Sequence, residues 1–118
     1  MAVQRLHRSR DIRAVFAARN VAHGRFASLH GRSAGERECS RVAVTASRHV
    51  GNAVQRNRAK RRLRAAAHGV DFPAGLDLVI RAKAQAIDAE FVLLGDELAR
   101  LARRVARRSG RVDGNGAR

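Results

Sequence analysis

The sequence predicts one α+β domain, in which helices pack on a β-sheet, and three observations lead to this prediction. The chain has 118 residues, which suits one compact domain but not two ordinary ones. Hydrophobic residues make up 45% of the sequence, enough to form a core. Apolar residues at helical spacing alternate with short β-prone segments, and together they give the order helix, strands, helix, strand, helix.

The N-terminal segment is predicted to be a basic arm followed by a helix. Residues 1–8 are basic, and we expect them to be mobile. Ser9 offers an N-cap for a helix over residues 9–19, with Asp11 in the first turn. Apolar side chains follow at helical spacing: Ile12, Val15 and Phe16.

Two strands joined by a loop are predicted next. Gly24 ends the helical pattern, and residues 25–30 favour a strand that contains Phe26. Residues 31–39 are polar and contain glycine, which is typical of a loop or hairpin connection. Residues 41–47 alternate between two faces, and this pattern predicts a half-buried strand with Val42, Val44 and Ala46 on one face.

A helix, a strand and a second helix complete the predicted domain. The first helix covers residues 52–68 and stops at Gly69, and a compact β-prone segment covers residues 76–82. Asp88 is expected to cap the last helix, with Glu90 in its first turn. An apolar stripe along that helix is formed by Phe91, Leu94, Leu98, Leu101 and Val105.

The C-terminal residues 109–118 are glycine-rich and charged, so we expect a disordered tail. The predicted organisation is therefore an arm over residues 1–8, a domain over residues 9–108 and a tail over residues 109–118.

The charge of the chain indicates a polyanionic partner. Lys and Arg number 25 against 10 acidic residues, which gives a net charge of +15. A chain this basic attracts nucleic acid through counterion release. An anionic membrane surface is the weaker candidate, because no long amphipathic segment pairs basic with bulky apolar residues. The alternative explanation of this charge is a general bias of composition toward Arg, which is indicated by the occurrence of Lys only at positions 60 and 83.

The remaining composition excludes several classes of protein. Cys39 is the single cysteine, so neither an intramolecular disulfide nor a cysteine-rich metal site can form. The sequence shows no apolar run typical of a signal peptide or a membrane span. We therefore expect a cytoplasmic protein.

The helix predicted over residues 52–68 has the strongest functional pattern. Asn57, Arg61 and Arg64 form one row at positions i, i+4 and i+7, with Arg58 and Lys60 beside it. The opposite face is apolar and can pack on the sheet. Like charges at i, i+4 destabilise a helix, and no acidic residue in this helix relieves them. RNA phosphates would neutralise such a face, whereas solvated faces usually mix both signs.

This helix also resembles a known family. The segment V-G-N-A-V-Q-R-N-R-A-K-R-R-L-R, residues 50–64, resembles the signature of the bacterial ribonuclease P protein family, including its Arg-Asn-Arg core at residues 56–58. The preceding R-V-A-V-T-A-S-R-H, residues 41–49, is similar to the family's strand before that helix. Other matches in order and spacing are Arg5 and Leu6, Val15 and Phe16, Phe26, and D-L-V-I-R-A at residues 77–82. The resemblance covers roughly residues 5–105.

The resemblance implies a fold and a function. The fold is an α-β-β-β-α-β-α two-layer sandwich with a mostly antiparallel central sheet and a left-handed β-α-β crossover, against the usual right-handed rule. The function is to assist a catalytic RNA, as the RNA-binding subunit of ribonuclease P, in removing the 5′ leader from precursor tRNA. The resemblance further implies one protein per RNA and higher affinity for substrate and Mg²⁺. The holoenzyme would require the Mg²⁺, and the chain itself would bind no cofactor.

The resemblance also implies two sets of RNA-binding residues. Residues of the basic helix would bind the RNA subunit: Arg56, Asn57, Arg58, Lys60, Arg61 and Arg64. Residues in a cleft between the first helix and the sheet would bind the single-stranded leader: Phe16, Phe26, Thr45, Ser47 and Arg48. Both phenylalanines could equally be core residues.

The sequence departs from the family pattern at a few positions. Ile12 replaces a common Phe, Ser28 and Leu29 stand where an aromatic is common, and His49 replaces a common Lys. Leader binding should therefore depend less on stacking and more on phosphate contacts.

The chain shows no pattern of a catalytic site of its own. Its acidic residues are scattered, and its five histidines have no metal-ligand spacing. Catalysis is therefore expected in the RNA subunit. Two alternatives remain at this stage: an RNA-binding protein of ribosomal type, and a freestanding ribonuclease.

Overall fold

A computed structural model describes residues 3–35 and 39–110, and it confirms the α+β class. Its elements follow one another as β1 (Gln4–Arg5), α1 (Ser9–Ala17), β2 (Val21–His23), β3 (Ala27–Ser33), β4 (Arg41–Thr45), η1 (Arg48–Val50), α2 (Ala53–His68), β5 (Leu76–Ala82), η2 (Ala84–Ala86) and α3 (Phe91–Arg108). From α1 onward this is the predicted order of helices and strands.

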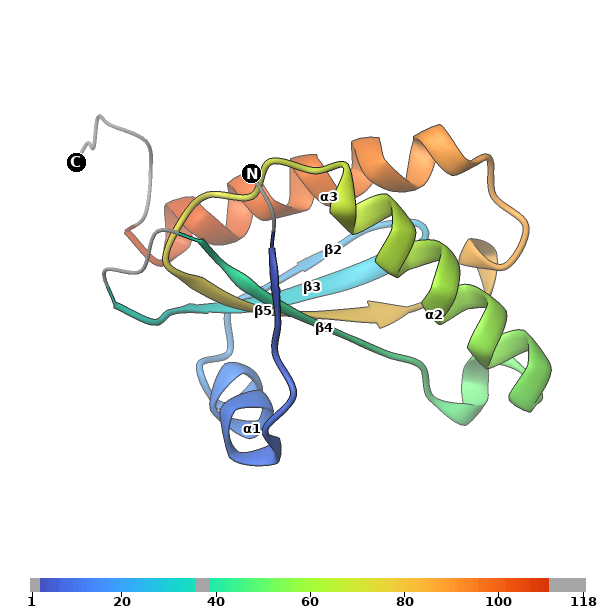
Figure 1. The fold of residues 1–118 in the computed structure, drawn as a ribbon, viewed down its shortest axis with the longest axis horizontal. Coiled ribbons are helices and arrows are strands. Elements are labelled where there is room, and N and C mark those ends of the chain that lie inside the picture. The colour runs from blue at the N-terminus through green and yellow to red at the C-terminus, as the bar shows by residue number, and fades with distance from the viewer. Residues whose placement is uncertain (1–2, 36–38, 111–118) are drawn as a thin grey trace.

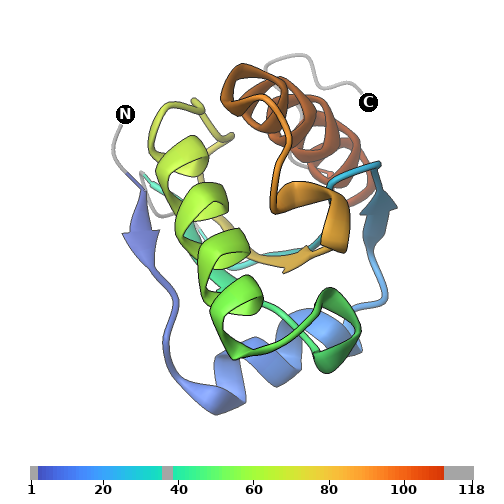
Figure 2. The same cartoon turned by 90° about the vertical axis from the view of Figure 1, so that its right-hand side faces the viewer.

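The strands form one five-stranded sheet in the order β1-β4-β5-β3-β2. The β1–β4 and β4–β5 pairings are parallel, and the β5–β3 and β3–β2 pairings are antiparallel. The sheet is thus evenly mixed, because residues 4–5 add a parallel edge strand that the sequence did not reveal. Helix α2 joins the adjacent parallel strands β4 and β5 by a left-handed crossover, which can be followed in Figure 2.

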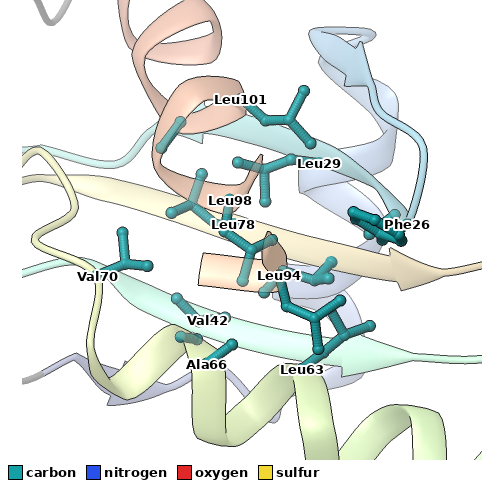
Figure 3. Packing of buried hydrophobic residues seen from close by; sticks show 14 of the residues in the cluster. Phe26, Leu29, Val42, Leu63, Ala66, Val70, Leu78, Leu94, Leu98 and Leu101 are labelled. Carbon is teal, nitrogen blue, oxygen red and sulfur yellow. The ribbon is translucent and has the colours of Figure 1, made fainter. Parts of the chain in front are cut away.

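The helices lie on opposite faces of the sheet. Helices α2 and α3 cover one face, and α1 lies on the other (Figure 1). The main core fills the space between the sheet and the helices α2 and α3, with Leu29, Leu78, Leu63, Leu98 and Leu101 among its members (Figure 3). A smaller cluster under α1 contains Leu6, Val15, Ala43 and Val79.

The first residues differ from the separate arm that we expected. The Gln4 N–H donates to the Ser40 carbonyl at 3.0 Å, and the Leu6 N–H donates to the Val42 carbonyl at 2.9 Å. The Leu6 side chain is only 2% exposed. A strand of two residues is too short to show alternation, so this edge of the sheet could not be predicted from periodicity.

The start of α2 agrees with the prediction, but the start of α3 does not. Asn52 caps α2 through a capping box, in which its Oδ1 accepts the Gln55 N–H and the Gln55 Oε1 accepts the Asn52 N–H, both at 2.9 Å. The predicted cap at Asp88 is wrong. Helix α3 begins at Phe91, after Glu90, whose side chain makes no capping bond. The short helix η2 occupies the preceding residues, so the chain reaches α3 later than the pattern indicated.

A buried carboxylate holds the turn between β2 and β3 against α3. Glu97 is 4% exposed. Its carboxylate accepts the backbone N–H groups of Arg25, Phe26 and Ala27 at 2.7, 2.8 and 3.0 Å. The loop predicted over residues 31–39 begins only after β3 ends at Ser33. Residues 36–38 of that loop, and the predicted tail beyond residue 110, lie outside the described residues.

Candidate nucleic-acid interface

The cationic side chains of α2 divide into two groups. Helix α2 buries Ala59, Leu63, Ala66 and Ala67, so its basic residues lie on the flanks and the outer side. Some of them donate hydrogen bonds to backbone carbonyls of neighbouring segments, and the rest have no acceptor among residues 3–35 and 39–110. The difference separates residues that stabilise the fold from residues that are available to a ligand.

Arg56, Arg58 and Arg62 belong to the group with protein acceptors. Arg56 Nη1 donates to the Gly51 carbonyl at 2.8 Å, just before α2. Arg58 Nε donates to the Ile87 carbonyl at 3.0 Å. Arg62 donates to the carbonyls of Ala86 and Ala89. The bonds of Arg58 and Arg62 fix the connection between β5 and α3 against α2, and the bond of Arg56 fixes the residue before Asn52 to the first turns of α2. Each guanidinium has five N–H donors, so Arg56 and Arg58 keep some for another acceptor.

The other group forms a continuous outer surface, which we call the α2 basic face. It consists of Asn57, Lys60, Arg61 and Arg64, at positions i, i+3, i+4 and i+7. Within residues 3–35 and 39–110, none of these four side chains has a hydrogen-bond or ion-pair partner. Three of the four are exposed, and Lys60 is half-buried. The α2 basic face therefore presents unsatisfied cationic donors to solvent.

A groove beside this face connects α2 with the N-terminal segment. Its volume is about 420 Å³, and its walls come from residues 3–7, β4, Ile12 of α1 and the end of α2. Arg64, Thr45, Arg5 and His7 supply polar groups to it. The structure thus places Arg64 and Thr45, which were predicted for different RNA partners, on the same groove.

A polar row crosses the sheet on its α1 side. Thr45 is in register with Arg81, Arg81 with Ser28, and Ser28 with His23. In-register neighbours on adjacent strands point to the same face, so these four side chains lie in line. The His23 Nδ1 and Ser28 Oγ atoms are 2.9 Å apart. The row gives the α1 side a line of polar groups, whereas the central strands present mainly apolar side chains to α2 and α3.

Phe16 of α1 lies next to this row. Its ring meets the ring of His30 edge-on, with centroids 4.7 Å apart, and the Arg81 guanidinium carbon lies 5.9 Å from the Phe16 centroid. Burial, followed by the charges of Arg81 and His23, lowers the pKa of His30 below its usual value of 6.5. The arrangement combines a partly buried aromatic ring, an imidazole and an exposed guanidinium, which suits a nucleotide with its phosphate.

Phe26 lies on the opposite side of the sheet from Phe16, so its predicted position in a cleft under α1 is wrong. It is 8% exposed and packs in the main core on the α2 and α3 side (Figure 3). Alternation would have placed it with Ser28 and His30. However, Phe26 precedes β3 in the turn held by Glu97, where strand alternation does not apply.

Ser47 and Arg48 lie where the chain leaves β4. Both are exposed, and the Ser47 Oγ accepts the His49 N–H at 3.3 Å at the start of η1. Of the five residues predicted to bind the leader, Phe16 and Thr45 therefore lie on the α1 side of the sheet, and Ser47 and Arg48 follow the end of β4.

Comparison with known proteins settles the family. The family model described as Ribonuclease P matches residues 1–106. The chain belongs to the ribonuclease P protein family. The ribonuclease P protein component of Bartonella quintana is 44% identical over 79 residues, which cover 64% of this chain and 59% of that protein. The component of Ruegeria pomeroyi is 52% identical over 60 residues, which cover 51% and 48%. The chain thus spans about half the length of the curated relatives it matches.

Solved structures of ribonuclease P proteins share this fold. The protein from Thermotoga maritima aligns with a TM-score of 0.72 at 25% identity, covering 86% of this chain and 96% of that one. The protein from Staphylococcus aureus aligns with a TM-score of 0.67 at 21% identity, covering 84% and 92%. The resemblance drawn from residues 50–64 is confirmed at the level of family and fold.

Two residues of this ribonuclease P family chain escaped the sequence analysis as site candidates. His30 and Arg81 lie beside Phe16, but the sequence pattern predicts each of them only as part of a strand. The signal that could have found them is alternation in β5, where Leu78 and Ile80 point to the main core and Arg81 must point to the other side.

A further polar pair on the α1 side, Asp77 with Arg41, already has its hydrogen bonds within the protein. Asp77 is fully buried and accepts two hydrogen bonds from Arg41, at 2.8 and 2.7 Å. The hydrogen bond to Asp77 raises the pKa of Arg41, with the nearby charge of Asp11 acting in the same direction. This pair stabilises the sheet and offers little to an RNA ligand.

The described residues contain neither a cluster of metal ligands nor a membrane-spanning helix. Among residues 3–35 and 39–110, no group of three or more His, Cys, Asp or Glu side chains could hold a metal ion. In the same part of the chain, no helix is long and apolar enough to cross a membrane.

Proposed function

We propose that this chain is the RNA-binding subunit of ribonuclease P, a cytoplasmic ribonucleoprotein that removes the 5′ leader from precursor tRNA. The observation that supports this proposal most directly is the α2 basic face. Its side chains have no acceptor in the described protein, and the family membership of the chain identifies RNA as the acceptor to expect.

The α2 basic face would bind the RNA subunit through phosphates. Arg61 and Arg64 can each grip a phosphate with two parallel N–H donors, and Lys60 adds a point charge. Lys60 and Arg64 repel each other at i, i+4, at a cost of a few tenths of a kcal/mol, and bound phosphates would remove this cost. Arg56 and Arg58 would contribute less, because their guanidinium groups already bond the Gly51 and Ile87 carbonyls.

The α1 side of the sheet would bind the single-stranded leader. Phe16 supplies a stacking surface, and Arg81 and Thr45 supply donors to the sugar-phosphate backbone. A single partly exposed aromatic ring favours sequence-tolerant binding, with most of the affinity from phosphate contacts. Ser47 and Arg48 would extend the path of the leader past the end of β4.

The role of the chain in the reaction would be auxiliary. We propose that the RNA subunit performs the hydrolysis with its own Mg²⁺ ions and that one protein binds one RNA without a cofactor of its own. Cationic side chains at the two surfaces would screen the repulsion between the phosphates of subunit and substrate. Less repulsion raises the affinity for precursor tRNA and lowers the Mg²⁺ concentration that the complex requires.

The test is cleavage of precursor tRNA at low Mg²⁺ by the RNA subunit from the same organism, with and without this chain. The chain should restore cleavage, and the double variant Arg61→Ala/Arg64→Ala should weaken RNA binding by roughly tenfold or more, the effect of losing two phosphate contacts. The matched control is Arg10→Ala/Arg13→Ala, which removes two exposed cations of α1 and should change little.

Three outcomes would contradict the proposal. Tight RNA binding without any effect on cleavage would indicate an RNA-binding protein of ribosomal type. Cleavage in the absence of the RNA subunit would indicate a nuclease site in the chain itself. Equal weakening by both double variants would remove the special role of the α2 basic face.

A further inference from the structure

We propose that the outer side of the C-terminal half of α3 is a second RNA-binding surface, which holds the phosphate backbone of a structured, double-stranded part of the RNA subunit. We call this surface the α3 basic face, and it consists of Arg100, Arg103, Arg104 and Arg107. The inference rests on the proposed function for the identity of its partner, but it concerns residues and a contact that the proposed function does not use.

The spacing of these arginines places them together on one side of α3. Counted from Arg100, they stand at i, i+3, i+4 and i+7, so they lie within about 100° of each other around the helix axis. All four are exposed. The opposite side of the helix is buried in the core by Leu94, Leu98, Leu101, Ala102 and Val105.

Three of these four arginines have no partner among the described residues, and the fourth, Arg100, has one weak ion pair. Arg103, Arg104 and Arg107 make no hydrogen bond or ion pair in the part of the chain that the structure describes. Arg100 Nη2 lies 3.7 Å from a Glu97 oxygen, but that carboxylate already accepts three backbone N–H groups. Arg108, by contrast, donates to the Val21 carbonyl and helps fix the helix to β2.

The helix dipole does not account for the whole surface. Cations in the last turn of a helix gain about 0.3–1 kcal/mol, and this effect ends within that turn. Arg100 and Arg103 lie before the last turn. Arg100 with Arg104, and Arg103 with Arg107, are like-charge pairs at i, i+4 that destabilise the helix. A polyanion bound along this side would turn both repulsive pairs into favourable contacts.

The α3 basic face is separate from the α2 basic face. Arg64 of α2 lines the groove beside Arg5 and His7, next to the edge strand β1. The end of α3 is fixed at the other edge strand, since the Asn20 Nδ2 donates to the Val105 carbonyl at 3.0 Å and Arg108 donates to Val21. The two basic faces are thus associated with opposite edges of the sheet, and α2 and α3 lie side by side between them (Figures 1 and 2).

The chemistry of the α3 basic face favours duplex RNA over a single strand or a protein. It has guanidinium groups but no aromatic ring for stacking and no amide that could read a base edge. A protein interface would have an apolar centre, whereas this surface is uniformly cationic. Double-stranded RNA is bound mostly by its shape and its backbone phosphates, which this set of donors can reach.

The experiment measures the affinity of the full chain for the RNA subunit over a range of salt concentrations. The test variant is Arg103→Gln/Arg107→Gln, and the matched control is Arg10→Gln/Arg13→Gln on α1. Each phosphate contact contributes roughly 0.7–0.9 to the slope of log affinity against log salt. We expect the test variant to lose about 1.4–1.8 from this slope and about tenfold in affinity. The control should lose neither.

A reference variant separates the failure of this inference from the failure of the proposed function. If Arg61→Gln/Arg64→Gln weakens RNA binding while Arg103→Gln/Arg107→Gln behaves like the control, the second surface is refuted and the proposed function stands. If neither variant differs from the control, the proposed function fails with it. If the test variant retains RNA affinity but loses binding to an acidic peptide, the partner is a protein and the inference is wrong. Thermal melts establish that each variant is folded.

Discussion

The two faces of strand β5 show how one strand can serve both stability and ligand binding. Leu76, Leu78 and Ile80 point to the α2 and α3 side, and all three are fully buried. On the α1 side, Asp77 pairs with Arg41, and the exposed Arg81 lies over the ring of Phe16. Because side chains alternate at every residue, neighbouring substitutions on this strand should have different kinds of effect. Changes at Leu76, Leu78 or Ile80 should lower stability, whereas a change at the exposed Arg81 should lower RNA affinity.

The largest expected effect is on the buried face. Leu78→Ala removes a fully buried side chain from the centre of the main core and should cost about 2–5 kcal/mol of the free energy of unfolding. Urea denaturation monitored by circular dichroism measures this change in the free energy of unfolding. The control is Val54→Ala, since Val54 is 76% exposed and its loss should change stability by less than about 0.5 kcal/mol. Equal effects at the two positions would contradict the description of this face as the main core.

A smaller effect is expected on the α1 side. Phe16→Leu keeps an apolar side chain against the α1 cluster but removes the ring, so it should lose about 1 kcal/mol of leader stacking, or about fivefold in affinity. The measurement compares precursor tRNA with a tRNA that lacks the leader, both bound to the holoenzyme. Only the precursor should bind less tightly. Equal loss for both RNAs would show that Phe16 acts through the fold.

The smallest expected effect is on the pH dependence of stability, through His30 beside Phe16. Burial lowers the pKa of His30, so the unfolded chain takes up a proton on this residue more readily than the folded chain does. The neutral His30 side chain therefore contributes to the free energy of unfolding. This contribution is complete above the unfolded pKa of about 6.5 and is lost as pH falls toward the lower folded pKa. Thermal melts at a series of pH values should therefore show a steeper decline for the natural chain than for His30→Gln. Parallel curves would mean that His30 titrates normally.

The sequence predicted those elements whose local signals are strong. The alternation of Val42 and Val44 located β4, and β5 has the predicted bounds, residues 76–82. Helix α2 begins at Ala53, one residue after the predicted start, because Asn52 and Gln55 form a capping box that depends only on local geometry. The resemblance to the family supplied the crossover, which no periodicity could indicate.

The elements that were missed depend on tertiary contacts. Strand β2 has three residues and β1 has two, so neither shows a period of its own. For the site, helical spacing grouped all the cations of α2, but it could not show that Arg58 and Arg62 bond carbonyls of residues 24 or more positions away. Phe26 was misplaced because the turn that orients it is held by a glutamate from the far end of the chain.

Glu97 also constrains the order in which parts of the protein can fold during synthesis. Glu97 is separated from its three amide donors by 70 to 72 residues. Gly24 in the same turn leaves no room for a side chain, since an added Cβ would lie 2.4 Å from the Glu97 carboxyl carbon. During synthesis the hairpin of β2 and β3 emerges from the ribosome long before α3 does. Its turn can acquire this acceptor only after residue 97 has been synthesised, so a nascent chain that stalls before residue 97 leaves that edge of the sheet without the carboxylate that holds it.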